Sequence, residues 1–404
     1  MLFMFGFIDI LKYNKDVNKI ILIMAMLRAI KVRLYPNKQQ EQALNKVLGC
    51  YRFVYNHMLA HKQEAYKVDK TNLSLNELSK YFHHELLKDE QYAWLKEQNT
   101  KVMKQSIRQM LTAYDNFFKH QKWFPKFKSK RDKQSALFPI DAISRCNDFE
   151  TRRITLIKQL KNIKFRCSDL YFNRLRKYKD DVKSATLSKT KSGNFFLSIL
   201  IDIPQSEFVK FKKTNKEVGI DLGVKDFVIT SDGKKFENKH FFKNDEQKLK
   251  KLQRQLSKKH KGSNNFHKQC KRIAKTFEHI TNKKENYIHY VVNELLGNYD
   301  TIYMENLSIN GMLRNHHLAK AISEVGFFKF KEILKNKAIV NDKKVVLIDK
   351  FYPSSKTCSC CGYKNKGLKL SDRNWQCPEC GANHDRDFNA ARNIFREGQR
   401  ISVA

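Results

Sequence analysis

The sequence predicts a multidomain α/β protein, and three observations lead to this fold class. Its 404 residues are enough for two or three domains, and a hydrophobic share of 41% provides a sizeable core. Helix-like and strand-like patterns occupy separate stretches before residue 213, whereas strands and helices are mixed after it. Near the C-terminus, two Cys-x-x-Cys pairs indicate a small metal-stabilised unit.

The chain is strongly basic, with 79 Lys and Arg residues against 41 Asp and Glu residues and a formal net charge of +38. Such an excess repels itself in the compact state, and a polyphosphate partner relieves the repulsion. A solvated lysine-rich surface would give the same excess of basic over acidic residues. A membrane-surface protein would usually concentrate the charge on one amphipathic helix. Nucleic acid is therefore the favoured partner.

The first 25 residues show no targeting pattern. Their two short apolar runs are separated by charged residues, and neither is long enough to span a membrane. A signal peptide places its positive charges before the apolar run, whereas here LFMFGF comes first. We expect residues 1–25 to be an extension outside the fold, with Met26 a candidate translation start. The expected location is cytoplasmic and nucleoid-associated, with no membrane partner.

Strand-like runs predict a small β-barrel assembled from residues 26–36 and 122–212. The run RAIKVRLYPNK alternates apolar and polar residues until Pro36 ends it. Alternating or apolar runs also occur between polar turns over residues 150–204. These runs are RRITLIK, NIKFRC, VKSATLSK and NFFLSILIDIP. Together with the strand near residue 30, they could close a barrel.

Residues 37–121 predict a helical domain. Apolar side chains recur at helical spacing from residue 38 to 66 and again from 99 to 120. Between these stretches, Ser74 and Glu77 stand in capping-box register at the start of SLNELSKYFHHELLK. Most of the aromatic residues in this region are expected to form the domain core.

The segment KWFPKFKSKRDK interleaves aromatic and basic side chains. Aromatic faces can stack on bases while the cations meet phosphate. A basic surface loop whose aromatic residues dock onto the helices would have the same composition, and both interpretations stay open. The candidate nucleic-acid contacts are Lys122, Phe124, Lys126, Phe127 and Lys128.

Residues 213–350 and 381–404 predict a mixed α/β domain with acids at the ends of its strands. Asp221 directly follows apolar residues in the hairpin EVGIDLGVKDFVITSDG, and Glu305 does so in TIYMEN. A basic helical pair over residues 244–298 separates these strands. A carboxylate at the end of a buried strand must be hydrogen-bonded, paired, or bound to a cation. Each acid alone is unremarkable, since an isolated Asp after a strand is usually a turn residue.

A third acid can converge on these two. On a helix through DFNAARNIF, Asp387 shares a small apolar face with Ala391 and Ile394, and that face can lie against a sheet. Asp385 falls on roughly the opposite side, which suits a cap or turn residue. Two acids on strands and one on a helix can share two Mg²⁺ ions, which activate water and stabilise the leaving oxygen in phosphodiester hydrolysis.

Residues 351–380 predict a zinc ribbon. Two Cys-x-x-Cys pairs 15 residues apart suit a tetrahedral zinc ion, and a glycine after each pair permits the knuckle turn. Cys360 is left over in this register. With no histidine and no open position in the set, we expect a structural zinc that fixes the start of the helix carrying Asp387. The expected ligands are Cys358, Cys361, Cys377 and Cys380.

Several long stretches, in a fixed order from residue 26 onward, carry a resemblance to a known family. They are RLYPNKQQEQALNKVLG, RFVYNHML, FPKFKSK, GIDLGVKDFVITSDG, YMENLSINGM, AISEVGFFKF, YPSSKTCSCCG and CPECGANHDRDFNAARNI. Almost the whole chain is similar to TnpB (OrfB), the insertion-sequence protein ancestral to type V CRISPR effector nucleases. The order of strands, helix and acids resembles the RuvC-like branch of the RNase H fold.

The resemblance implies an RNA-guided DNA endonuclease. A guide RNA derived from the transposon end would select a double-stranded DNA target by pairing, and the protein, a monomer with one RNA, would read a short adjacent motif. The RuvC-like domain with its inserted zinc ribbon would cut with magnesium at the family's catalytic positions, Asp221, Glu305 and Asp387. The same resemblance implies zinc at the four cysteines, a helical recognition lobe over residues 37–121 and a wedge barrel from the flanking strands.

Two other functions fit part of the sequence. A DNA-binding accessory or repressor of transposition would have the same charge, barrel and zinc ribbon, but it would not need three acids. A DDE-type transposase shares the RNase H fold and its three carboxylates. The zinc ribbon between the last strand and the final acid favours TnpB.

Overall fold

The computed structural model describes residues 27–143, 149–204, 207, 211–308, 311, 316–369 and 372–403. The chain divides into two compact units, Met1–Gln205 and Ser206–Ala404, which are described separately. The extension expected at residues 1–25 lies outside the described residues. Among the helices of the described ranges, none is long and apolar enough to cross a membrane.

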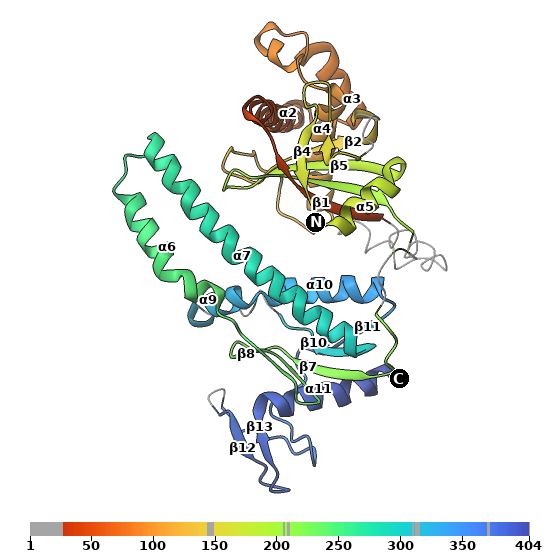
Figure 1. The fold of residues 1–404 in the computed structure, drawn as a ribbon, viewed down its shortest axis with the longest axis vertical. Coiled ribbons are helices and arrows are strands. Elements are labelled where there is room, and N and C mark those ends of the chain that lie inside the picture. Colours follow the sequence, from red (N-terminus) through yellow and green to blue (C-terminus); the bar gives the residue numbers. More distant parts are fainter. Residues whose placement is uncertain are drawn as a thin grey trace. The chain divides into compact units, whose positions relative to one another are not determined.

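The N-terminal unit contains a six-stranded antiparallel sheet of order β2-β5-β6-β1-β4-β3 (Figure 1). Its strands are β1 (Leu27–Tyr35), β2 (Gln134–Pro139), β3 (Arg153–Ile154), β4 (Ile163–Arg166), β5 (Val182–Lys189) and β6 (Phe195–Asp202). The predicted association of the strand near residue 30 with the later strands is confirmed, since β1 pairs with both β4 and β6. Closure of this sheet into a barrel stays a prediction.

The helices of this unit are α2 (Lys38–Asp69), α3 (Leu75–Tyr81), α4 (Thr100–Phe118) and α5 (Asp169–Lys177). The predicted capping box is confirmed at the start of α3. Ser74 Oγ accepts a hydrogen bond from the Glu77 amide, and the Glu77 carboxylate accepts one from the Ser74 amide. Helix α5, which the sequence patterns did not predict, interrupts the β region between β4 and β5.

The C-terminal unit is built on a five-stranded mixed sheet of order β11-β10-β7-β8-β9. Its strands are β7 (Glu217–Asp221), β8 (Asp226–Thr230), β9 (Lys235–Glu237), β10 (Thr301–Glu305) and β11 (Lys344–Ile348). Strand β10 runs parallel to β7 and to β11, whereas β8 is antiparallel to β7 and to β9. The hairpin predicted at EVGIDLGVKDFVITSDG and the strand predicted at TIYMEN are confirmed as β7, β8 and β10. Continuous apolar runs such as those of β7 and β10 are typical of strands covered on both faces.

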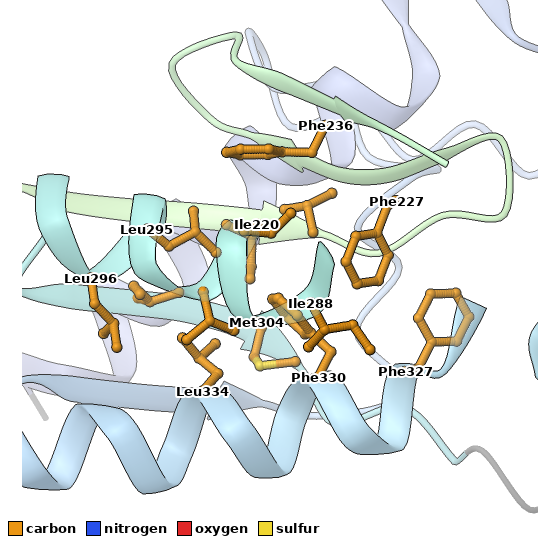
Figure 2. Close-up of a cluster of buried hydrophobic side chains, with 14 of the residues drawn as sticks. Ile220, Phe227, Phe236, Ile288, Leu295, Leu296, Met304, Phe327, Phe330 and Leu334 are labelled. Carbon is orange, nitrogen blue, oxygen red and sulfur yellow. The ribbon is translucent and has the colours of Figure 1, made fainter. Parts of the chain in front are cut away.

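Helices cover both faces of this sheet. On one face, α7 (Asn264–Asn298) and α10 (Phe327–Val340) enclose a hydrophobic core that includes Ile220, Leu295 and Phe330 (Figure 2). On the other face, Tyr303, Ile348 and Ile394 bring β10, β11 and α11 (Arg386–Val403) together. Helix α6 (Phe241–Ser257) precedes α7 and forms a hairpin with it, and α9 (His316–Val325) precedes α10.

A small two-stranded sheet lies between β11 and α11. It consists of β12 (Asn374–Gln376) and β13 (Asn383–Asp385), which pair in antiparallel register (Figure 1). Strand β13 follows the last cysteine pair and runs directly into α11. The cysteine segment is therefore joined without a linker to the helix that carries Asp387.

Candidate active site and metal centre

Asp221 and Glu305 end two neighbouring strands at the same edge of the sheet. Strands β7 and β10 are parallel, and Ile220 lies opposite Met304 in their register. The next residue on each strand is an acid, so the two carboxylates leave the sheet side by side. The carboxyl ends of parallel strands are a common position for functional sites in such sheets.

Asp387 reaches this edge because α11 lies unusually close to β7. A Cβ atom added to Gly219 would stand 2.4 Å from the carbonyl oxygen of Ala391 and 2.7 Å from the Cβ of Phe395. Only a glycine permits this approach of strand and helix. Ala391 and Ile394 are buried, as the helical register predicted, and Asp387 lies one turn earlier in the first turn of α11.

The charges of Glu305 and Asp387 both act on Asp221. Burial, followed by the nearby charges of Glu305 and Asp387, raises the pKa of Asp221 to about 8. Burial also raises the pKa of Glu305, and the hydrogen bond from Ser354 opposes this shift. Like charges gathered in a partly buried site favour either protonation or a bound cation. The structure thus brings together the three acids that the sequence selected.

The donor set fits magnesium, which prefers carboxylate oxygens. Asp221 and Glu305 end neighbouring strands, and the charge of Asp387 acts on Asp221, so these three acids would supply the ligands of magnesium. Arg373, from the cysteine segment, donates to Asp387 Oδ2 at 2.9 Å.

Asp385 has the role of a cap, as expected. Its Oδ1 accepts hydrogen bonds from the amides of Asp387 and Phe388, each at 3.1 Å. Its Oδ2 pairs with the Lys235 ammonium at 2.8 Å. These contacts lower the pKa of Asp385 in spite of its partial burial. With both oxygens engaged, Asp385 is less available as a metal ligand than Asp387.

The four cysteines selected from the spacing form one cluster. The sulfur atoms of Cys358, Cys361, Cys377 and Cys380 all lie within 4.8 Å of one another. Two of the separations, Cys358 to Cys380 and Cys361 to Cys377, are 3.7 and 3.6 Å. A tetrahedral zinc with bonds of about 2.3 Å to sulfur sets its ligands about 3.8 Å apart. The donor set therefore fits zinc.

The sequence patterns missed a histidine beside this cluster. His384 Nε2 lies 3.0 Å from Cys358 Sγ, and its ring lies 4.7 Å from that of Trp375 on the paired strand. Cys358, Cys360 and His384 make up a second, smaller group of neighbouring donor atoms in the described part of the chain. His384 was missed because the zinc ligands were predicted from the Cys-x-x-Cys spacing, and this histidine is not part of that spacing.

Two buried asparagines of α11, Asn389 and Asn393, were also missed. They are only 1% and 3% exposed, and both bind the segment that leads from β11 to the first cysteine pair. Two polar residues one helical turn apart, on a helix face otherwise made of Ala and Ile, are the signal that would have found them.

The basic aromatic segment divides into docked and exposed residues. Phe124 packs edge-on against the rings of Tyr114 and Phe117. The Lys128 ammonium bonds Gln109 Oε1 at 2.8 Å and lies over the ring of Tyr55. Phe124 nevertheless stays 44% exposed, and Lys122, Trp123, Lys126 and Phe127 are exposed as well. Contact between nucleic acid and the five candidate residues stays a proposal.

Known proteins resemble this chain over almost its whole length. A Streptomyces pristinaespiralis protein named "Putative RNA-guided DNA endonuclease" is 32% identical over 377 residues, which cover 93% of this chain and 90% of that protein. Residues 198–316 match the family OrfB IS605, described as "Probable transposase". The chain belongs to the TnpB (OrfB) family. This TnpB-family chain is also 29% identical to an Escherichia coli K12 protein named "Putative RNA-guided DNA endonuclease InsQ", with 94% of each chain covered.

Two further family matches fall on other parts of this TnpB-family chain. Residues 327–394 match the "Cas12f1-like, TNB domain", which spans α10 to the middle of α11 and includes all four clustered cysteines. Residues 24–71 match a family described as "Helix-turn-helix domain". In the described part of that range, the structure has strand β1 followed by the single continuous helix α2.

Solved structures share the fold of this TnpB-family protein. A Cas12f1 chain from a Cas12f1–sgRNA–target DNA complex superposes with a TM-score of 0.57 at 15% identity, covering 89% of this chain and 83% of that one. The mini-RNA-guided endonuclease CRISPR-Cas phi3 gives a TM-score of 0.52 at 10% identity, with 92% of each chain covered. At these identities, the similarity concerns the fold alone.

Proposed function

We propose that this protein is an RNA-guided DNA endonuclease that hydrolyses phosphodiester bonds with magnesium. One observation carries the proposal: Asp221 and Glu305 end adjacent parallel strands, and the charge of Asp387 acts on the same site. The relatives described as RNA-guided DNA endonucleases align over more than nine-tenths of the chain, which supports the same activity.

The topology of the C-terminal unit supports an RNase H-like, RuvC-type nuclease domain. Three consecutive strands form an antiparallel meander, β10 adds in parallel beside the first of them, and β11 adds in parallel beside β10. We assign residues 213–350 and 381–404 to this domain, with the zinc ribbon of residues 351–380 inserted before α11. In the N-terminal unit, we assign residues 37–121 to a recognition lobe and the antiparallel sheet, from residues 26–36 and 122–212, to a wedge domain.

The residues of the chain have distinct tasks in this mechanism. Magnesium, when bound, supplies the activation of water and the stabilisation of the leaving oxygen. Asp221, Glu305 and Asp387 hold the ions, and Asp221 must first lose the proton that its raised pKa retains. Asp385 caps α11 and so orients Asp387. The four cysteines hold a structural zinc, which stabilises the segment before α11.

The partners that we propose are a guide RNA from the transposon end and a double-stranded DNA target. The net charge of +38 is suited to binding both polyanions. Base pairing with the guide would select the target, as in other RNA-guided nucleases, while the protein holds the duplex by its backbone. We propose one protein molecule for each RNA, acting on DNA at the nucleoid in the cytoplasm.

The proposal is tested with the full-length protein and the RNA that copurifies with it. Sequencing this RNA gives the guide, and the substrate is a plasmid that carries the matched sequence beside a randomised flank. We expect cutting that needs both the match and Mg²⁺ and that disappears with EDTA or a scrambled target. Binding without cutting would favour the accessory or repressor function. Cutting without a matched guide would indicate an unguided nuclease.

A further inference from the structure

A buried polar network joins α11 to the segment between β11 and the first cysteine pair. The Asn389 side chain donates to the Thr357 carbonyl oxygen at 2.7 Å and accepts from the Ser359 amide at 2.9 Å. The Asn393 side chain donates to the carbonyl oxygens of Ser354 and Thr357 at 2.8 and 2.6 Å. All five residues are buried. Since buried polar groups are costly unless bonded, this network fixes the segment on the helix.

Ser354 connects this network to the active site. It is 5% exposed, and its backbone carbonyl is held by Asn393 on α11. Its hydroxyl donates a hydrogen bond to Glu305 Oε1. A single residue therefore ties the helix that carries Asp387 to the carboxylate at the end of β10.

We infer that Ser354 is a positioning residue for Glu305 and that Asn393 holds it in place. This inference rests on the proposed function of Glu305 as a magnesium ligand. The hydrogen bond to Oε1 restrains the rotation of the carboxylate and so would fix its orientation toward a cation that Glu305 holds. Partners of this kind orient the ligands of a metal, and their loss weakens metal binding although they never touch the ion.

If Ser354 had only a structural role, the expected results would differ. A serine that only satisfies its buried surroundings would change the melting temperature when replaced, but not the affinity for the cation. Ser355 offers a matched control, because it stands next in the same turn and is partly buried. In the described structure, the Ser355 hydroxyl is not among the donors to Glu305.

The test compares Ser354→Ala and Ser354→Cys with Ser354→Thr and Ser355→Ala, each as the full chain with its RNA. The Ala and Cys variants lose the strong hydroxyl donor, whereas Thr keeps it. We expect the Mg²⁺ concentration for half-maximal cleavage to rise about 10- to 100-fold in the Ala variant. The Cys variant should lie between Ala and wild type. The Thr variant should need nearly the same Mg²⁺ concentration as the wild type, and Ser355→Ala should leave this concentration unchanged.

A second measurement reads metal binding without DNA cleavage. With added hydrogen peroxide and ascorbate, Fe²⁺ that replaces Mg²⁺ is oxidised to Fe³⁺ as it reduces the peroxide to hydroxide and a hydroxyl radical, and ascorbate regenerates Fe²⁺. The radicals cut the protein backbone beside the site, and Asp221→Ala gives the background. The Fe²⁺ concentration needed for Asp221-dependent cutting should rise in Ser354→Ala by the same factor. Unchanged metal dependence in both the Ala and Cys variants would overturn the inference. Absence of Asp221-dependent cutting in the wild type would instead overturn the proposed magnesium site, and the inference with it.

Discussion

Among single residues, Asp221 has the clearest consequence for stability. Its pKa rises from 3.8 to about 8 through burial and the charges of Glu305 and Asp387. The unfolded chain releases this proton near the ordinary value, while the folded chain retains it. The favourable contribution of the protonated group is thus complete below about pH 3.8 and is lost as the pH rises through about 8.

We therefore predict that the metal-free protein loses stability between pH 5 and pH 8, and that Asp221→Asn loses less. The asparagine cannot ionise, so it removes the linkage between proton release and unfolding. Thermal melts in EDTA at the two pH values measure the effect, and added Mg²⁺ at pH 8 should restabilise only the wild type. An equal loss of stability in the wild type and in Asp221→Asn would show that Asp221 does not titrate as an acid with a raised pKa.

At the scale of one residue, the helical register was enough to distinguish the two acids at the start of α11. The period of 3.6 residues put Asp387 with the buried Ala391 and Ile394, and it left Asp385 free to cap the helix. The contact of Arg373 with Asp387 was not predictable. It depends on how the cysteine segment folds back onto α11, which no local periodicity encodes.

Among the elements, α11 depends on two glycines that let it lie close to the sheet. A Cβ at Gly219 would meet backbone atoms of α11, and a Cβ at Gly398 would meet the ring of Tyr303 at 2.1 Å. The contacts at Gly219 cannot be relieved by rotating a side chain, because they involve the backbone. The distance between Asp387 and the strand acids thus depends on the absence of a side chain on β7.

We predict that Gly219→Ala destabilises the protein by about 1–3 kcal/mol or more and strongly reduces cleavage, because overpacking forces α11 away from β7. The matched control is Gly49→Ala in α2, where an added Cβ meets nothing within 4 Å. This control should be neutral or stabilise the helix by up to about 1 kcal/mol. Thermal unfolding and plasmid cleavage measure both variants. A tolerated alanine at Gly219 would mean that α11 is not so closely packed.

The proposed zinc ribbon gives a second prediction at this scale. Cys377→Ser should lose zinc in metal analysis and loosen the packing near Asp387, since the first knuckle is bonded to Asn389 of α11. Cys360→Ser should retain zinc, because Cys360 lies outside the four-cysteine cluster. Equal loss of zinc in the two variants would contradict the four-cysteine ligand set. Loss in Cys360→Ser alone would favour the alternative group of Cys358, Cys360 and His384.

The elements found from the sequence were those with long, clear periodicity. The helical pair α6 and α7 and helix α11 have such patterns, whereas the short strands β7 and β8 were found from their continuous apolar runs. The nine-residue helix α5 was missed because it offers only a few turns of pattern and carries charged residues throughout. The buried asparagines were missed because their partners are backbone atoms far away in the sequence.

For the whole molecule, we predict that the first residues are dispensable. Deleting residues 2–25 should leave the melting temperature and cleavage unchanged, because the regular alternation of β1 begins only near residue 28 and pairs from Leu27 onward with β6. Thermal unfolding and plasmid cleavage of the deleted protein measure this. A large fall in either quantity would mean that the extension packs on the core.

The most direct test of the central claim is plasmid cleavage by three acid variants, measured beside a gel shift with the same guide. Asp221→Ala, Glu305→Ala and Asp387→Ala should each abolish cleavage, since each removes a ligand of the ions. Guide and target binding should survive, because they rest on the basic surface and on base pairing. Asp385→Ala is the control and should still cut, at a reduced rate and with about 0.5–2 kcal/mol less stability from the lost cap. Full cutting by the Asp387 variant would contradict the account, and loss of binding in all three would show that these acids hold the fold.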